Sequence, residues 1–402
     1  MKKILFLFLL GLTGFASSCS KDDDDPNVFA DETFRNWCLT QYDTDQDGDL
    51  SLQELLYVTE MTLPPGTGIT SLQGIGNFIV LQKLNCSSLG LTSLDLRQCE
   101  LLTELDCSGN QLKTLDLNYR TGLQKLNCSS NQLTTLKIDQ CSALTELRCS
   151  DNQLTELKFG YGTSLEVLDC GYNQLTSLDI SRYKELKELY CSENALTEME
   201  LLNFPELTRL HCDGNNIEDL HLGLLPSLRT LYCSSRALKN ITLTGCPALS
   251  YLDCSYSSLP SLNLKDKTSL NTLKCQDNGT LSHLDLTGCS NLGLLDCSEN
   301  DLISLNLNDC TKLEQLDAYQ NSLLNLYTDQ ITRLQSVDVS DNTLTKLDLS
   351  SSPFIEQIYF QNNGALEAIY VSERVDIDSQ TNARGRWIEM DKPNKGVLQY
   401  KQ

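Results

Sequence analysis

Twelve residues near the start of the chain carry an unusual density of oxygen donors. The stretch DTDQDGDLSLQE, residues 43–54, has acidic side chains at its first, third, fifth, seventh and twelfth positions and a glycine at its sixth. Carboxylates this close together repel one another unless a cation neutralises them. A hard cation such as calcium binds about six to eight oxygen ligands. The loop is therefore the first candidate for a metal site.

The spacing resembles the EF-hand family of calcium-binding loops, and the resemblance implies a role for each donor. The implied ligands are Asp43, Asp45, Asp47 and Glu54 through side-chain oxygens, Asp49 through its carbonyl and Ser51 through a water molecule. EF-hands usually occur in pairs, yet the sequence holds no second loop, so a single hand has to pack its apolar side elsewhere. Calcium in a structural role is the one cofactor that we expect. The alternative is a solvated acidic loop that binds no ion.

The cysteines are a second potential source of chemistry. The chain has 18, and 11 of them recur at a nearly fixed interval. On stacked parallel strands their Cβ atoms would lie about 4.8 Å apart, whereas a disulfide needs about 3.8 Å. A straight column also cannot offer zinc four thiolates in a tetrahedron. We therefore expect these cysteines to be small, buried, apolar side chains.

The sequence shows no catalytic constellation. The three histidines, His211, His221 and His283, lack the spacing of metal ligands or of a catalytic triad. A nucleophile elbow, a phosphate-binding loop and a zinc motif are also missing from the sequence. We expect that the protein is not an enzyme and that its function lies in a binding surface.

A repeat over most of the chain has to position these residues. From Leu81 onward, units such as LTELDCSGNQLKTLDLNYRTG follow one another every 21 residues, with one step of 22. Fourteen copies of LxxLxCxxNxLxxLxLxxxxx are present, and a period of this length indicates a solenoid of stacked coils. The sixth position holds the cysteine column, which comprises Cys86, Cys107, Cys128, Cys149, Cys170, Cys191, Cys212, Cys233, Cys254, Cys275 and Cys297.

This repeat closely resembles that of the leucine-rich repeat family, and its nested halves of ten and eleven residues resemble bacterial members. Polar and apolar residues alternate in each half, which predicts two short strands per coil. The expected fold is a leucine-rich repeat solenoid, mainly parallel β on both faces with few helices, forming a rod of roughly 65 Å. The repeat's asparagine, present in 11 coils from Asn110 to Asn363, can bond backbone groups of neighbouring coils. Leu89, Arg236 and Ser257 replace it elsewhere.

The ends of a solenoid need caps. The segment NVFADETFRNWCLTQY predicts an amphipathic helix with Phe34 and Trp37 on its apolar side, and SLQELLYVTEM predicts a second helix. The tail is expected to close the other end with Trp387 and Ile388. The predicted divisions are an EF-hand-like helical cap over 27–68, the solenoid over 69–373 and a C-terminal cap over 374–402.

The first residues, MKKILFLFLLGLTGFASSC, join a basic start to an apolar run too short to span a bilayer, which is typical of an export signal. Cys19 follows small residues as in a bacterial lipobox, and SKDDDDP resembles the surface-export tag of Bacteroidetes lipoproteins. These resemblances imply a lipoprotein signal peptide over 1–18, lipidation at Cys19 and an acidic lipidated linker over 19–26. The implied location is the outer membrane, as a cell-surface lipoprotein held only by its lipid anchor. An ordinary cleaved signal followed by an acidic linker is the alternative.

The chain is strongly acidic, with 54 acidic and 31 basic residues and a formal net charge of −23. Such a surface repels phosphates. We therefore expect no nucleic acid partner.

One group of exposed strand positions differs from the rest of the repeat, where such positions hold small or charged residues. The candidate ligand-binding residues are Tyr190, Arg209, His211, Asp213, Tyr232, Tyr251 and Asp253. Rigid amphipathic rings beside charged groups are typical of protein or glycan recognition. Aromatic residues also favour strands without any ligand, so a purely structural origin stays open.

Together these features predict a cell-surface lipoprotein that displays a leucine-rich-repeat scaffold for protein or glycan recognition, in adhesion or ligand capture, with a calcium-stabilised N-terminal cap. The alternative is a structural envelope or adhesion spacer without a specific ligand pocket.

Overall fold

The computed structural model describes residues 28–162, 164–376, 379–384, 386, 388–391 and 398–400. The predicted signal peptide, Cys19 with its linker, and Trp387 lie outside the described residues. Within the described ranges, no helix is both long and apolar enough to cross a membrane.

The residues before the solenoid form a small helical cap. Helix α1 spans Glu32–Tyr42 and begins after Asp31, whose side-chain oxygen accepts a hydrogen bond from the backbone N–H of Phe34 at 3.0 Å. Such an N-cap satisfies one of the donors that a helix start leaves free. Phe34 and Cys38 are fully buried, and Trp37 is half-buried beside them. The predicted first helix and its apolar side are therefore present.

The second predicted helix is largely replaced by a strand. Helix α2 spans only Leu52–Leu55, and strand β1 follows at Glu60–Thr62. Met61 is only 2% exposed and takes the place of the inward leucine of later coils. The helix expected over SLQELLYVTEM is wrong beyond its first turn, because an extended backbone is needed to bury Met61 in the solenoid. The long sheet thus begins ahead of residue 69.

Polar and aromatic contacts fix the cap to the first coil. The second oxygen of Asp31 accepts hydrogen bonds from the backbone N–H groups of Thr70 at 2.7 Å and Ser71 at 3.1 Å. Burial alone would raise the pKa of Asp31, but the hydrogen bonds together have the larger effect, so the pKa lies below its ordinary value. The ring of Tyr42 lies against Phe78, with centroids 5.8 Å apart. One carboxylate therefore joins the helix start to the solenoid.

One parallel sheet of 16 strands runs along the solenoid. In each coil the central residue of the strand points inward and pairs with its equivalent in the next coil, as Leu210 does with Leu231. The strands are β1, β2 (Lys83–Asn85), β3 (Glu104–Asp106), β5 (Lys125–Asn127), β7 (Glu146–Arg148), β8 (Val167–Asp169), β9 (Glu188–Tyr190), β11 (Arg209–His211), β13 (Thr230–Tyr232), β15 (Tyr251–Asp253), β17 (Thr272–Lys274), β19 (Leu294–Asp296), β21 (Gln315–Asp317), β23 (Ser336–Asp338), β25 (Gln357–Tyr359) and β27 (Glu389–Met390).

The opposite face holds five shorter sheets of two or three parallel strands within the described residues. Parallel β structure on both faces with few helices is therefore confirmed. The strands are β4 (Thr114–Asp116) and β6 (Thr135–Lys137); β10 (Leu201–Asn203), β12 (Asp219–Leu224) and β14 (Asn240–Thr242); β16 (Ser261–Asn263) and β18 (His283–Asp285); β20 (Ser304–Asn306) and β22 (Asn325–Tyr327); β24 (Lys346–Leu349), β26 (Ala368–Val371) and β28 (Leu398–Tyr400). A 3-10 turn, η1, spans Ile75–Asn77.

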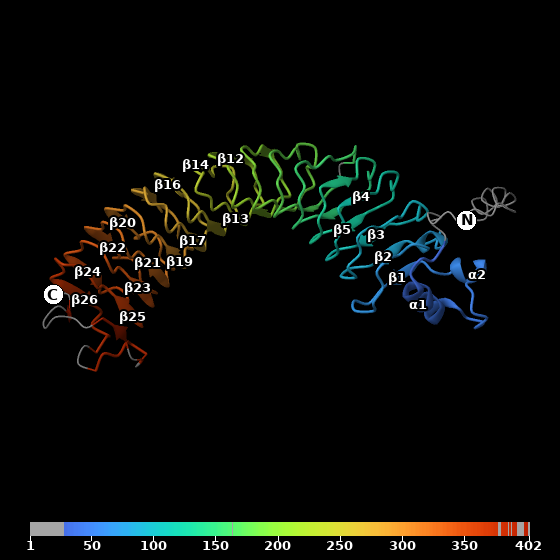
Figure 1. Ribbon diagram of the computed structural model, residues 1–402. Coiled ribbons are helices and arrows are strands. Elements are labelled where there is room, and N and C mark those ends of the chain that lie inside the picture. Colours follow the sequence, from blue (N-terminus) through green and yellow to red (C-terminus); the bar gives the residue numbers. More distant parts are fainter. Residues whose placement is uncertain are drawn as a thin grey trace.

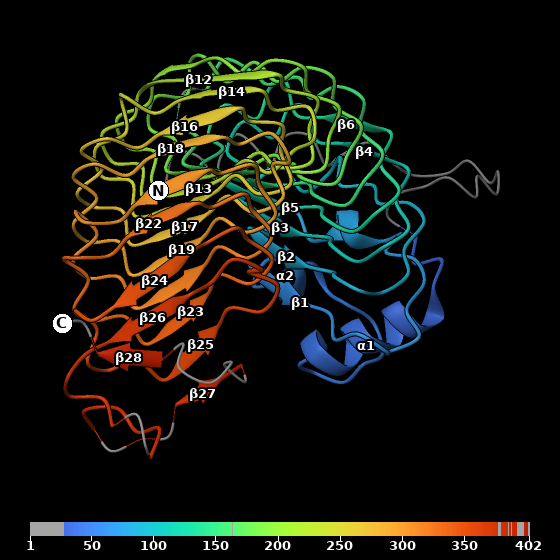
Figure 2. The ribbon, with the colours of Figure 1, turned by 90° about the vertical axis from the view of Figure 1, so that its left-hand side faces the viewer.

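The solenoid is an arch rather than the expected straight rod (Figure 1). The long sheet lines the concave side, and the short sheets lie on the convex side. Viewed toward one end, the coils wind around a common interior, and the cap lies beside β1 (Figure 2). The bend follows from unequal pairing, because the continuous sheet holds its strands about 4.8 Å apart while the interrupted face is free to spread.

The interior is one continuous apolar cluster of leucines and cysteines. All column cysteines are at most 3% exposed, as expected, and each is a free thiol. Burial raises the pKa of Cys128 to about 12, so that thiol stays protonated at neutral pH. At the C-terminal end, β27 and β28 extend the two faces and Ile388 is buried, so the core continues into the predicted C-terminal cap.

The asparagines form a ladder that joins successive coils. The side-chain amide of Asn194 donates to the carbonyl of Cys170 in the preceding coil at 3.0 Å and to that of Cys191 in its own coil at 3.2 Å. Its oxygen accepts from the backbone N–H of Leu175 at 2.9 Å. The same contacts recur from Asn110 to Asn363, which confirms the expected backbone role.

The ladder is interrupted next to the candidate ligand residues. Arg236 points outward and forms an ion pair with Asp277 at 2.7 Å, two coils away. The hydroxyl of Ser257 donates to the carbonyl of Ser255 in its own coil at 3.2 Å and accepts from the N–H of Ser235 at 3.2 Å. In these coils, hydroxyl contacts and one ion pair therefore replace the asparagine amide bridges.

Candidate functional site

Four rings form an aromatic stack across the centre of the concave sheet. The stack consists of Tyr190, His211, Tyr232 and Tyr251, on strands β9 to β15. Ring centroids are 4.8 Å apart for Tyr190 and His211, 4.3 Å for His211 and Tyr232, and 4.9 Å for Tyr232 and Tyr251. The first three lie directly opposite one another on neighbouring strands, and Tyr251 joins diagonally from the next strand. The structure thus brings together the aromatic residues that the sequence singled out.

Three of the rings overlap in a tilted stack, whereas Tyr190 meets His211 edge to face at 60°. The planes of His211 and Tyr232 are inclined by 37°, and those of Tyr232 and Tyr251 by 31°. Each ring is half-buried. Because side chains stand roughly perpendicular to a sheet, ring edges and polar ends point away from it. The stack therefore presents hydroxyl and imidazole groups on a rigid apolar base.

Charged side chains flank the stack and are held in place. Glu188 accepts a hydrogen bond from the hydroxyl of Tyr190 at 2.9 Å and forms an ion pair with Arg209 at 3.4 Å. Asp213 accepts from the hydroxyl of Ser192 at 2.8 Å. These contacts hold the carboxylates in place before any ligand binds. Binding would therefore cost less conformational entropy.

At the other end of the stack, Asp253 lies opposite Tyr232 in the strand register. One of its oxygens accepts hydrogen bonds from the hydroxyls of Ser234 at 3.0 Å and Ser255 at 2.6 Å. All seven predicted ligand residues thus lie within four adjacent coils.

The surroundings of His211 disfavour its protonated form. Burial lowers its pKa, and the nearby Arg209 lowers it further, whereas Asp213 acts in the opposite direction. Burial also raises the pKa of Tyr190 and Tyr251, so both phenols stay protonated. The stack itself carries no charge, and the charge at this site comes from the flanking residues.

Sequence analysis missed a second column on the same sheet, which we name the acidic stack. Asp296, Asp317 and Asp338 occupy equivalent positions of β19, β21 and β23 and pair in register. No ion pair to any of the three occurs among the described residues. Burial and the two neighbouring carboxylates raise the pKa of Asp317, although a hydrogen bond from Gln315 lowers it. The sequence could have revealed this column, because the three aspartates occupy the same position of the repeat as Tyr190.

The acidic loop brings three of its predicted ligands together. Carboxylate oxygens of Asp43, Asp45 and Asp47 lie within 4.8 Å of one another. The two oxygens of Asp43 accept from the backbone N–H groups of Gln46 at 2.7 Å and Gly48 at 3.0 Å. The N–H of Asp47 lowers the pKa of Asp45, but burial and the neighbouring carboxylates raise it overall. This oxygen-rich group fits a hard cation.

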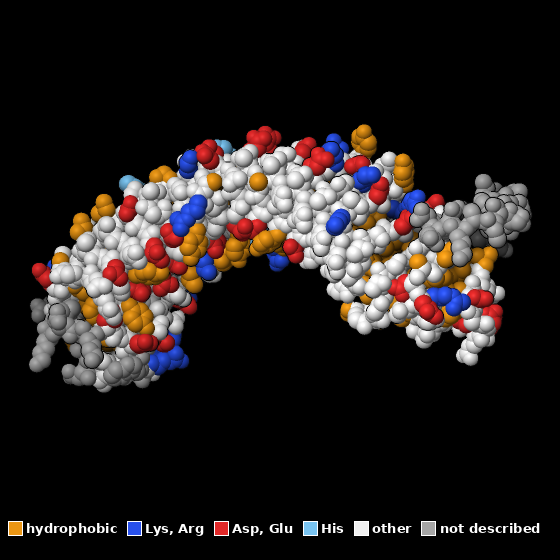
Figure 3. Space-filling model, viewed as in Figure 1, with side chains coloured by type: hydrophobic (Ala, Val, Ile, Leu, Met, Phe, Trp, Pro, Cys, Tyr) orange, Lys and Arg blue, Asp and Glu red, His pale blue; other side chains and the backbone are white. Residues whose placement is uncertain are grey.

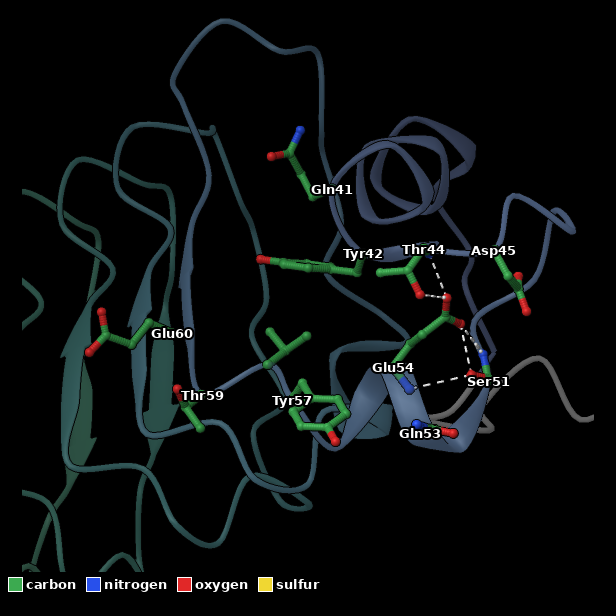
Figure 4. A pocket seen from close by; sticks show the side chains of 11 residues that line it. Gln41, Tyr42, Thr44, Asp45, Ser51, Gln53, Glu54, Tyr57, Thr59 and Glu60 are labelled. Carbon is green, nitrogen blue, oxygen red and sulfur yellow. Dashed lines mark hydrogen bonds between the residues drawn. The ribbon is translucent and has the colours of Figure 1, made fainter.

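Glu54, the expected bidentate ligand, is placed differently. One oxygen accepts from the N–H and hydroxyl of Thr44, and the other accepts from the N–H and hydroxyl of Ser51 at 2.8 Å (Figure 4). These bonds lower the pKa of Glu54 to about 2. Ser51 and Glu54 form a capping box for α2, and its geometry draws the carboxylate away from the three aspartates. The predicted ligand set is therefore only partly assembled.

The remaining predicted ligands lie close to the three aspartates along the loop. The carboxylate of Asp49 forms an ion pair with Arg35 at 3.0 Å, and Arg35 also donates to the carbonyl of Gly48 at 2.9 Å. A cavity of about 600 Å³ opens beside the loop, with Tyr42, Glu54 and Tyr57 in its lining (Figure 4). Helix α1 and the loop are thus tied together by one arginine.

Comparison with solved structures identifies the fold. The functional domain of InlJ from Listeria monocytogenes, described as including a cysteine ladder, is 29% identical, with a TM-score of 0.63 over 77% of this chain and 76% of that one. A leucine-rich repeat protein of Leptospira interrogans is 22% identical, with a TM-score of 0.64 over 85% of this chain and 97% of that one. Toll from Drosophila, in its complex with Spatzle, is 18% identical, with a TM-score of 0.54 over 75% of this chain and 50% of that one. The chain therefore has the leucine-rich repeat fold, as its repeat predicts.

No protein-family model matches the chain, and no curated protein matches it.

Proposed function

We propose that this protein is a cell-surface lipoprotein whose concave sheet binds a protein ligand through the aromatic stack, in adhesion or ligand capture. The observation that carries the proposal is the convergence of four aromatic side chains where other coils present small or charged residues. Tyrosine dominates protein interfaces because it buries a large rigid surface at low entropic cost. Leucine-rich repeat structures solved with a protein bound, such as Toll with Spatzle, are consistent with this role.

The geometry of the stack favours a protein over a glycan. A sugar ring binds by laying its apolar side on an open aromatic face. Here the faces of His211, Tyr232 and Tyr251 cover one another, with centroids 4.3 and 4.9 Å apart. Ring edges, hydroxyls and fixed carboxylates are left for contact, which suits hydrogen bonding by a polypeptide.

The cap is proposed to be stabilised by calcium, and the protein to be anchored by a lipid. Asp43, Asp45 and Asp47 would hold the ion, which would remove the repulsion among their carboxylates. Acyl chains on Cys19 would provide the membrane anchor. Cys19→Ser is expected to release the protein from washed membranes, whereas Ser20→Ala should leave it bound. Membrane retention of the Cys19→Ser variant would contradict lipid anchoring.

An array experiment tests the binding function. Soluble protein comprising residues 28–402 is screened against surface proteins and glycans, in parallel with the variant Tyr190→Ala/Tyr232→Ala. The matched control is Tyr119→Ala/Tyr161→Ala, which removes two tyrosines that are 74% and 91% exposed outside the stack. A protein hit that is lost only in the stack variant is the expected result. A hit that survives in that variant, or hits confined to glycans, would overturn the proposal, and no hit would favour the spacer.

A further inference from the structure

We propose that the concave sheet recognises a cationic partner: an extended, lysine- or arginine-rich protein segment that lies along the arch over the aromatic stack and the acidic stack together. This inference rests on the proposed binding function and names the chemistry of its ligand. In Figure 3, acidic and hydrophobic side chains line the inner edge of the arch over its middle and C-terminal coils, with some basic side chains among them.

The N-terminal part of the concave sheet neutralises its own charges. Lys83 lies between Glu60 at 3.4 Å and Glu104 at 3.5 Å on neighbouring strands. Two further pairs, Glu166 with Lys187 at 2.7 Å and Glu188 with Arg209 at 3.4 Å, continue this pattern toward the aromatic stack. Opposite charges on adjacent strands stabilise a sheet. These pairs compensate much of the charge in this part of the surface, although Asp106 and Asp169 form no ion pair among the described residues.

The C-terminal part breaks this pattern. The column that starts at Asp253 continues through Lys274 into the acidic stack of Asp296, Asp317 and Asp338. Among the described residues, neither Lys274 nor any aspartate of this column takes part in an ion pair. Like charges directly opposite one another destabilise a sheet. The acidic stack is thus an uncompensated charge that a cationic partner would neutralise.

The carboxylates of the acidic stack are held in fixed positions. Asp296 accepts from the hydroxyl of Ser298 at 2.6 Å, Asp338 from the N–H of Ser340 at 2.9 Å, and Asp317 from the side-chain amide of Gln315 at 2.9 Å. Each of these contacts engages one carboxylate oxygen. Lysine and arginine form their strongest hydrogen bonds with ionised carboxylates of this kind.

The dimensions of the surface fit a short extended segment. Seven coil-to-coil steps separate Tyr190 from Asp338, which corresponds to about 34 Å at a strand spacing of about 4.8 Å. An extended chain covers that distance with about ten residues. The aromatic stack would contact the apolar parts of the segment, and its basic side chains would reach Asp253 and the acidic stack.

A bound metal ion is a weaker explanation of the acidic stack. Among the described residues, the one group of three acidic side chains with ligand atoms within 4.8 Å of one another is Asp43, Asp45 and Asp47. The three carboxylates of the acidic stack do not converge in this way. They form a row, which matches successive side chains of a peptide better than a single ion.

The test uses three fluorescein-labelled ten-residue peptides, alternating Lys-Tyr, Glu-Tyr and Ser-Tyr, and measures binding by fluorescence anisotropy at low and high salt. The expected result is that the lysine peptide binds the wild-type protein and the other two do not. Asp296→Asn/Asp317→Asn/Asp338→Asn should weaken that binding at least tenfold and reduce its salt dependence. The matched control, Asp219→Asn/Asp285→Asn/Asp309→Asn, makes the same change in net charge on strands β12 and β18 and in a turn after β20, outside the concave sheet, and should change binding less than twofold.

Four outcomes would overturn the inference. The control variant could lose as much affinity as the acidic-stack variant, which would mean that overall charge alone attracts the peptide. The serine or glutamate peptide could bind as well as the lysine peptide. Calcium could displace the lysine peptide from the Asp43→Ala variant as well as from the wild-type protein, which would assign the acidic stack to a metal. If a protein hit from the array depends on Tyr190 and Tyr232 but not on the acidic stack, the inference fails while the proposed function stands.

Discussion

Replacing Asp317 by asparagine should stabilise the protein, although the change removes a charged side chain from its surface. Asp317 is half-buried and lies in register between Asp296 and Asp338. A cross-strand pair contributes about 0.2–1 kcal/mol, and like charges act against stability. Removing two repulsive pairs should therefore raise the free energy of unfolding by about 1 kcal/mol at pH 7. An asparagine oxygen can still accept the hydrogen bond from Gln315.

The pH dependence gives the sign of this effect a second test. The pKa of Asp317 is raised in the folded state, so its charge destabilises the fold at pH values above that pKa. The penalty disappears as the pH falls below the pKa of the unfolded chain, about 3.9. The advantage of Asp317→Asn should thus be full at neutral pH and vanish near pH 3.5. Urea unfolding, followed by circular dichroism, measures the free energy of unfolding of both proteins at each pH.

Asp285 provides a control of opposite sign. Hydrogen bonds from the side chain and backbone of Thr287 lower its pKa, so its charge stabilises the fold above the unfolded pKa and this contribution is lost as the pH falls. Asp285→Asn should therefore destabilise the protein at neutral pH and have little effect in acid. If Asp317→Asn and Asp285→Asn shift the urea midpoint in the same direction at pH 7, the reasoning about uncompensated charge is wrong.

Five other perturbations test the scaffold and the cap. Asn194→Ala should cost about 3 kcal/mol in urea unfolding, because three carbonyls and one N–H lose their partner, and a cost below about 1 kcal/mol would contradict the role of the ladder. Cys128→Ser should cost about 1–3 kcal/mol through a buried, poorly bonded hydroxyl. Asp31→Ala should speed hydrogen exchange in residues 28–80 alone, since it removes the N-cap and the bonds to the first coil, and faster exchange throughout the solenoid would refute this local effect. Calcium in about hundredfold excess over its Kd should protect the same residues by about 2.7 kcal/mol. Asp45→Asn should abolish that protection, because it removes one of the three grouped carboxylates. Calcium-dependent exchange in the aromatic stack would show that the loop does more than stabilise the cap.

The period of the repeat predicted most of the fold, because each coil contacts only its neighbours and a local pattern determines a local structure. The inward leucines, the cysteine column and the asparagine ladder all follow from position within the unit. The arch did not follow, since curvature depends on the difference in pairing between two faces, and the sequences of the two half-units hardly differ. The strand at Met61 was not predicted, because the segment has a helical pattern and only the packing of the Met61 side chain into the core favours an extended backbone.

At the candidate sites too, some features could be predicted from the sequence and others could not. The aromatic stack was visible in the sequence because tyrosine is rare at those positions, whereas aspartate is common in the repeat and its uncompensated charge appears only when ion pairs are known. Glu54 satisfies two local patterns at once, the last position of an EF-hand-like loop and the third position of a capping box. Spacing alone cannot decide between these two roles. The backbone N–H groups of Thr44 and Ser51 decide in favour of the capping box, because both donate to the Glu54 carboxylate.

If the proposed lipid anchor and the proposed concave ligand hold, the interrupted asparagine ladder has a mechanical consequence, because the protein would then be tethered at one end and pulled at its concave surface. Coils joined by equivalent contacts behave as springs in series, and such a row stretches most where one spring is softest. At Arg236 and Ser257 the amide bridges between coils are missing, and the ion pair of Arg236 with Asp277 spans the gap from outside. Load would therefore open the arch beside the aromatic stack before its ends, so a bound partner would feel tension first as a change in the curvature of its own binding surface.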